Sequence, residues 1–459
     1  MTPTVLVLLG LASVAAILLL IIKAKAHPFL ALLIVSVALA LAAQVPMAEV
    51  VPMLKDGMGK TLGNVALIVT LGAMLGRIVE VSGGAEVLAR SLLKAFGPKR
   101  APWALGAASF LFGIPVFVDV ATIVLVPIVL AVARRITGRV NMLAYALPTV
   151  MALLTVHVVL PPHPGIVGGA ESMGADVGLV LMIGLVPAVV MWLFSQVLSG
   201  FLVHRVHSDV PAAGVAAAGV AENEETELAD HELPSAGLVL AMILVPLVLI
   251  MSQTVSALAL PEDSTVRGFF DLVGASPMAL LIGVLLAIAC LGLARGWGLA
   301  RVEDVLASAL PATAAVILIT GAGGTFGYVL SETGVADAVA DMLTSTGLPI
   351  LLLAWLMAAF IRAAQGSATV ATMTTAPLIA PMAVAAGLSA PQIALVTVTI
   401  GIGSMALSHV NDSLFWVWSR YFRVGTSEAL RSYTVATTAT SIVGLGVAAL
   451  LWPLVAMIG

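Results

Sequence analysis

Long apolar runs separated by short charged segments recur along the whole chain and constrain its fold more than any other feature. Apolar residues make up 61% of the 459 residues and charged residues 10%, against roughly 45–50% and roughly 25% in soluble proteins. A soluble fold could not shield so much apolar surface from water. The pattern therefore predicts an all-α polytopic protein of the cell membrane, plasma or inner.

Charge and cysteine content exclude other classes of protein. The net charge is −4 and no basic stripe occurs, which argues against a nucleic-acid partner. Cys290 is the single cysteine, so the chain is not a disulfide-rich secreted domain. The sequence contains no Gly-rich loop followed by Lys that would bind a nucleotide. This argues against an ATP-driven pump.

Apolar runs of the roughly 20 residues needed to cross a bilayer predict the spans. We expect them near 4–22, 27–45, 62–80, 142–173, 177–203, 236–256, 276–294, 306–330, 391–420 and 433–457. Lys23 and Lys25 follow the first run rather than precede it, so it is interpreted as a retained span and not as a signal peptide. Because Lys and Arg gather on the cytoplasmic side, their distribution predicts that both termini lie outside.

Two further apolar stretches, 103–133 and 349–387, are interrupted by Gly, Pro or small polar residues. Each could be two spans or one re-entrant hairpin that returns to the side it entered from, and charge placement does not decide between these alternatives. Their short arms and interrupted centres favour hairpins.

The acidic, Ala- and Gly-rich segment 204–234 predicts a flexible cytoplasmic linker between the halves 1–203 and 235–459. The halves share weak matches in the same order: Gly76–Gly83 pairs with Gly327–Gly334, and Asp119–Thr122 pairs with Thr369–Thr372. On the expected topology, matched segments cross the membrane in opposite directions. Inverted repeats of this kind build secondary transporters with a binding site at the midplane, where broken helices meet.

Ionisable residues inside apolar segments are candidates for function because burying a charge in a membrane is costly. Asp119, beside the centre of the first hairpin, is either a paired structural acid or a protonatable site residue. Arg362, just before the centre of the second hairpin, could bind a carboxylate with its guanidinium fork or form a salt bridge to a nearby acid. Gly366, Ser367 and Thr369 follow it and offer backbone and hydroxyl groups suited to an anion.

Two helices are expected to be broken within the membrane. The segment 161–165 contains three prolines around His163, which could carry a proton, donate to a substrate, or cap freed carbonyls. The matching break at 408–413 supplies polar groups that could bond hydroxyls or pair with a proton, namely His409, Asn411, Asp412 and Ser413. His157 is interpreted as a helix-packing residue, and Trp416, Trp418 and Tyr421 as an interfacial aromatic belt.

These motifs resemble those of the gluconate permease family of gluconate:proton symporters. The resemblance rests on Pro161–Gly165, Phe117–Val120, Arg362 with Gln365–Ala371, and Ser408–Trp416. Ser367–Thr369 is also similar to a hairpin tip of sodium-coupled dicarboxylate carriers in the ion transporter superfamily. The resemblance implies an elevator-type homodimer whose mobile domain carries both hairpins and both broken helices. Ile166 and Leu414 depart from the usual family pattern and leave the substrate open.

The function expected from these features is import of gluconate or a similar hydroxylated monocarboxylate by proton symport, with no enzymatic activity, metal or cofactor. The expected substrate-binding residues are Arg362, Gly366, Ser367, Thr369, His163, His409, Asn411 and Ser413. The expected proton-coupling residues are Asp119, Asp412 and His163, with Asp119 favoured because its neighbours offer little hydrogen bonding. Alternatives are a sodium-coupled carboxylate carrier, a permease for D-serine or idonate, a passive channel and a membrane-embedded enzyme.

Overall fold

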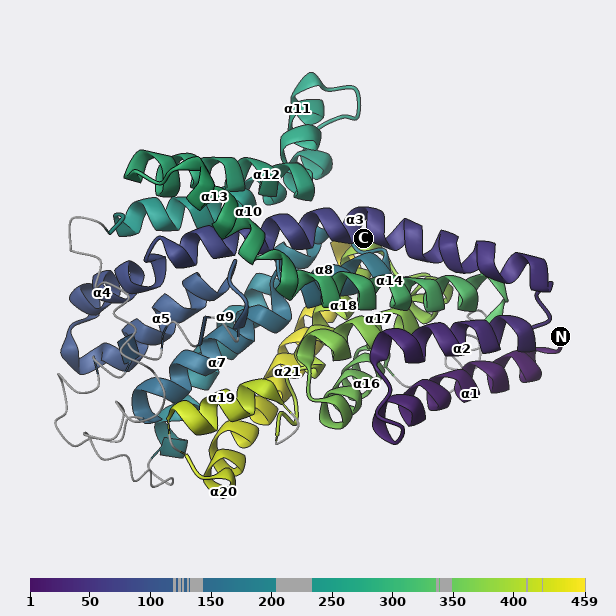
Figure 1. The fold of residues 1–459 in the computed structure, drawn as a ribbon. Helices are drawn as coiled ribbons and strands as arrows, with labels where there is room; N and C mark the ends of the chain where they lie inside the picture. Colours follow the sequence, from purple (N-terminus) through teal and green to yellow (C-terminus); the bar gives the residue numbers. More distant parts are fainter. Residues whose placement is uncertain are drawn as a thin grey trace.

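The protein is described by a computed structural model (Figure 1). It describes residues 1–458 except 119–120, 123–124, 126–127, 130–131, 133–142, 204–232, 336–337, 339–348, 410–411 and 423. The described residues form helices and contain no strand. Asp119, Asn411 and the centre of the acidic linker lie outside the described residues.

The first half of the chain contains α1 (Pro3–Ile22), α2 (Pro28–Ala42), α3 (Met47–Val81), α4 (Gly84–Phe96), α5 (Ala101–Gly113), α7 (Leu143–Val159), α8 (Pro164–Met173) and α9 (Val177–Val203). The second half begins with α10 (Ala236–Ala259), α11 (Thr265–Val273), α12 (Ser276–Ala287), α13 (Leu299–Ser308) and α14 (Leu310–Glu332). It continues with α16 (Ile350–Gln365), α17 (Ala368–Ala385), α18 (Ala390–Gly403), α19 (Ser413–Tyr421), α20 (Thr426–Ala429) and α21 (Val435–Ile458). Several helices have Pro in their first turn, where the missing N–H costs no hydrogen bond.

Seven of the described helical segments are long and apolar enough to cross a membrane. This supports the expected multi-pass membrane protein. The span expected at 62–80 is only the second half of α3, which begins at Met47. The apolar-run criterion missed the first half because Lys55, Asp56 and Lys60 interrupt the run, although their exposed side chains do not interrupt the helix.

The centre of the molecule brings the two halves of the chain together. Helix α3 packs along α14, and α8 packs against α17, α14 and α18 (Figure 1). Close approach depends on glycine: a Cβ built on Gly165 in α8 would lie 3.0 Å from Cα of Thr369 in α17. A Cβ on Gly76 in α3 would lie only 2.0 Å from the carbonyl oxygen of Pro115.

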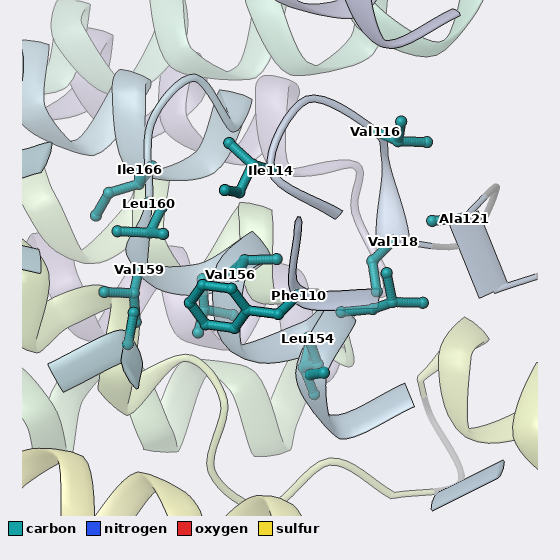
Figure 2. Close-up of a cluster of buried hydrophobic side chains, with 14 of the residues drawn as sticks. Phe110, Ile114, Val116, Val118, Ala121, Leu154, Val156, Val159, Leu160 and Ile166 are labelled. Atoms are coloured by element: carbon teal, nitrogen blue, oxygen red, sulfur yellow. The ribbon is translucent and has the colours of Figure 1, made fainter. Parts of the chain in front are cut away.

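The first interrupted stretch turns inside an apolar core. Helix α5 ends at Gly113, and Ile114, Val116 and Val118 follow in the turn and the next helical residue. These side chains are buried together with Val156 and Leu160 at the end of α7 (Figure 2). The core fixes the turn beside the break between α7 and α8.

Candidate functional site

The end of α16 presents Arg362 inward. Its residue is 2% exposed, and its Nη1 donates to the carbonyl oxygen of Gly366 at 2.5 Å. Gly366 ends the helix in the left-handed conformation (φ 83°), which favours glycine, and its N–H donates to the carbonyl of Arg362. The helix end thus holds its own arginine in place.

Asp412 lies directly against this guanidinium. Arg362 Nη2 donates to Asp412 Oδ2 at 2.5 Å and to Ser408 Oγ at 2.9 Å, and the Ser408 hydroxyl also donates to Oδ2. Asp412 Oδ1 accepts from the N–H of Leu414 at 3.0 Å, at the start of α19. Of the two readings of Arg362, the structure therefore shows the salt bridge, and both partners are buried.

The guanidinium is not saturated by this pairing. Arg362 Nε is buried and has no hydrogen-bond partner among the described residues. Asp412 binds the guanidinium through a single oxygen, whereas a bidentate carboxylate would bind two parallel donors. One donor therefore remains available for a further acceptor.

Two histidines connect the turns of the two interrupted stretches. His163 Nε2 lies 3.1 Å from the carbonyl oxygen of Val116 and 3.1 Å from His157 Nδ1. His157 Nε2 lies 3.2 Å from Thr369 Oγ1. This chain of contacts runs from the turn after α5, across the break between α7 and α8, to the start of α17.

The remaining polar residues stabilise helix ends. Ser367 accepts from the N–H of Val370 at 3.3 Å and caps the N-terminus of α17. His409 Nε2 lies 2.9 Å from the carbonyl oxygen of Ala363 near the C-terminus of α16. The N-termini of α8 and α17 meet through Gly165 and Thr369, so their N–H groups and partial positive charges converge.

Comparison with known proteins identifies the family. A sequence profile described as GntP family permease matches residues 4–455. The chain belongs to the GntP permease family. The inner membrane permease YgbN of Escherichia coli K12 is 40% identical over 99% of this chain and 100% of its own length. The gluconate permeases of Pseudomonas aeruginosa and Bacillus subtilis are 37% and 36% identical, over 95% and 97% of this chain and 95% and 98% of their own lengths.

Solved structures share the fold at low sequence identity. Neisseria gonorrhoeae MtrF, which represents a class of antimetabolite efflux pumps, gives a TM-score of 0.68 at 15% identity, over 95% of this chain and 96% of its own length. The Alcanivorax borkumensis YdaH transporter gives 0.59 at 15% identity, over 94% and 98%. This chain is thus a permease with a transporter fold and not an enzyme.

The structure of the permease extends one assignment made from the sequence and corrects another. His157 does not merely pack between helices, because it bridges His163 and Thr369. Its only sequence signal was a second histidine on the same apolar segment, just before the proline-rich break. Trp418 does not belong to an interfacial belt, because it is buried and stacks with Tyr433 at 6.3 Å between ring centroids.

The structure describes most, but not all, of the expected site residues. Gly366, Ser367, Thr369, His163, His409, Arg362 and Asp412 all lie at the helix ends described above. Asp119 and Asn411 lie outside the described residues, and the side chain of Ser413 is not described.

A small cavity of the permease opens beside the first turn. It is lined by Gly76, Arg77, Glu80, Val116, Phe117 and Ser308, among others. Phe117 meets the His163 ring edge-on, at 5.9 Å between centroids, and Val116 bonds His163. The cavity therefore reaches the wall of the site from the side of α3.

Proposed function

We propose that this permease imports gluconate or a similar hydroxylated monocarboxylate by proton symport. The observation that carries this proposal is a buried arginine with an open donor, beside two helix N-termini that converge. Together they form an environment that favours a carboxylate. Relatives at 36–37% identity are named gluconate permeases.

The proposed roles follow from the chemistry of each group. Arg362 binds the substrate carboxylate, and the backbone of Gly366 lies beside it. The hydroxyl groups of a sugar acid are bound by side chains at the same helix ends, namely Ser367, Thr369, His163, His409, Asn411 and Ser413. The proton is carried by Asp119, Asp412 or His163.

We also propose the architecture expected from the repeats. Gly83 and Gly334 both adopt positive φ values, 83° and 71°, just after the ends of α3 and α14. Because these glycines occupy matching places in the two halves, they support a repeat, and the charge distribution gives its inverted direction. The proposal includes two re-entrant hairpins, an elevator motion and a homodimer in the inner membrane, with the linker cytoplasmic and both termini outside.

Transport by the purified protein in proteoliposomes tests this function. Labelled gluconate should accumulate when the lumen is made alkaline, and collapse of the pH gradient should abolish accumulation. Accumulation driven only by a sodium gradient would show that the coupling ion is sodium and not the proton. Leak without saturation would indicate a channel. Competition by unlabelled sugar acids and D-serine ranks the substrates.

A further inference from the structure

The Arg362–Asp412 pair leaves one guanidinium donor without an acceptor among the described residues. Arg362 Nη2 has two protons, and its two acceptors are Asp412 Oδ2 and Ser408 Oγ. Nε, on the same edge of the guanidinium, has no partner among the described residues. A carboxylate that binds this edge bidentately needs Nε and one Nη2 proton, so it must displace one of the two present acceptors.

Charge selects which acceptor leaves. The pair is neutral as a unit and both side chains are nearly fully buried, with 2% and 4% of their side-chain surface exposed. A monocarboxylate entering beside it would create a net negative charge in a poorly hydrated site, which is strongly unfavourable unless it is neutralised. Binding of one proton restores neutrality.

We propose that the substrate carboxylate and Asp412 are alternative ligands of Arg362, and that Asp412 takes up a proton when the substrate displaces it. This inference rests on the function proposed above and adds how the proton and the substrate are coupled. One proton enters with each monocarboxylate, so the cycle moves no net charge through this site. Release of the substrate returns Arg362 to Asp412, which then loses the proton to the other side.

The surroundings suit a carboxyl group that alternates between two states. Ser408 donates to Asp412 now, and its oxygen can accept from the protonated acid after a rotation of the hydroxyl. Tyr433 Oη lies 3.5 Å from Oδ2, and the N–H of Leu414 donates to Oδ1, the oxygen that is not bonded to Arg362. Asp412 can therefore stay in place while only its bond to Arg362 is exchanged.

The other titratable groups near the pair have hydrogen-bond partners other than Arg362 and Asp412. His409, from the same segment as Asp412, is bonded to the carbonyl oxygen of Ala363. His157 of α7 lies within electrostatic range of Arg362 but bonds His163 and Thr369. Among described residues, Asp412 is the one carboxylate bonded to the arginine.

The exchange can be tested by measuring the binding of labelled gluconate to the full-length protein in detergent at several pH values. For the wild type, the affinity should fall as the pH rises, by up to about tenfold per pH unit, since one proton binds with the substrate. A pH-indicator dye in weak buffer should report uptake of about one proton per gluconate bound. Asp412→Asn should bind gluconate with an affinity that does not depend on pH and should take up no proton.

Controls assign the effect to Asp412. Asp271→Asn, an exposed aspartate on α11, should retain the wild-type pH dependence. Asp119→Asn tests the alternative proton carrier named above. If Asp119→Asn removes the pH dependence while Asp412→Asn keeps it, the proposed exchange is refuted.

The wild-type measurement decides the question even if Asp412→Asn does not fold. Gluconate binding without proton uptake would overturn the exchange and leave the proposed substrate intact. Failure of the wild type to bind gluconate or any other sugar acid would overturn the proposed function, and the exchange with it.

Discussion

At the scale of single residues, the site is defined by which acceptor holds Arg362. The sequence identifies Arg362 and Asp412 as unusual charges in apolar surroundings, and both belong to the site. A salt bridge was one of the two expectations for Arg362, but its partner was not predictable, because it depends on how the end of α16 lies against the segment before α19. His157 was missed for the same reason: its partner Thr369 lies on a distant segment of the chain.

Substitution of Arg362 separates an anchor from a structural charge. Arg362→Lys keeps the charge but cannot reproduce the planar fork, so the apparent affinity for substrate should fall roughly 10–100-fold. Arg362→Ala should abolish saturable uptake and, by leaving Asp412 buried without its counter-charge, should destabilise the protein by about 3–5 kcal/mol. Uptake in proteoliposomes and thermal unfolding measure the two effects. Wild-type affinity in Arg362→Ala would show that the residue serves only the salt bridge.

The contacts of His157 with His163 and Thr369 lead to a second prediction at the scale of single residues. His157→Phe fills a similar volume but loses the contacts to His163 and Thr369, and should slow transport roughly tenfold or more. Thr369→Val should have a similar effect. Because both changes remove the same contact, the double variant should be much less impaired than the sum of the two single effects. Fully additive losses of initial uptake rate would show that the bridge has no role.

At the scale of helices, proline and glycine made the interruptions predictable. Helix α7 ends at Val159 and α8 begins at Pro164, where the sequence places three prolines. The two helices on either side of Gly366 are α16 and α17, as expected from Gln365–Ser367. The full length of α3 was not predictable from apolar runs, since its first half carries exposed charges.

Close contact between α3 and the first turn gives a prediction for two glycines of one helix. In Gly76→Ala the new Cβ would meet the Pro115 carbonyl, so the turn must shift, at a cost of about 1–3 kcal/mol and with reduced transport. Gly63→Ala adds the same group where nothing lies within 4 Å, and should be neutral or slightly stabilising. Thermal unfolding and uptake should separate the two variants. Equal behaviour would mean that the turn does not depend on this contact.

At the scale of the whole molecule, alternation of apolar and charged segments was enough to predict a polytopic helical protein. Hydrophobic runs report which segments avoid water, but not how they pack, so the contact of α8 with α17 required the structure. The orientation in the membrane is inferred from Lys and Arg placement. It is the part of the whole-molecule interpretation that experiment can test most directly.

Cysteine labelling tests that orientation on one residue at the open end of each proposed hairpin. Lys99 precedes α5 and Ala386 follows α17, and both are exposed. Because inverted repeats open their hairpins to opposite sides, the proposed topology places Lys99 inside and Ala386 outside. In a Cys290→Ser background, an impermeant maleimide applied to right-side-out vesicles should label Ala386→Cys and leave Lys99→Cys unlabelled until the membrane is permeabilised. The parent Cys290→Ser protein controls for background labelling and must still transport. Labelling of both positions from one side would refute the inverted repeat and the meeting of two oppositely oriented hairpins at the site.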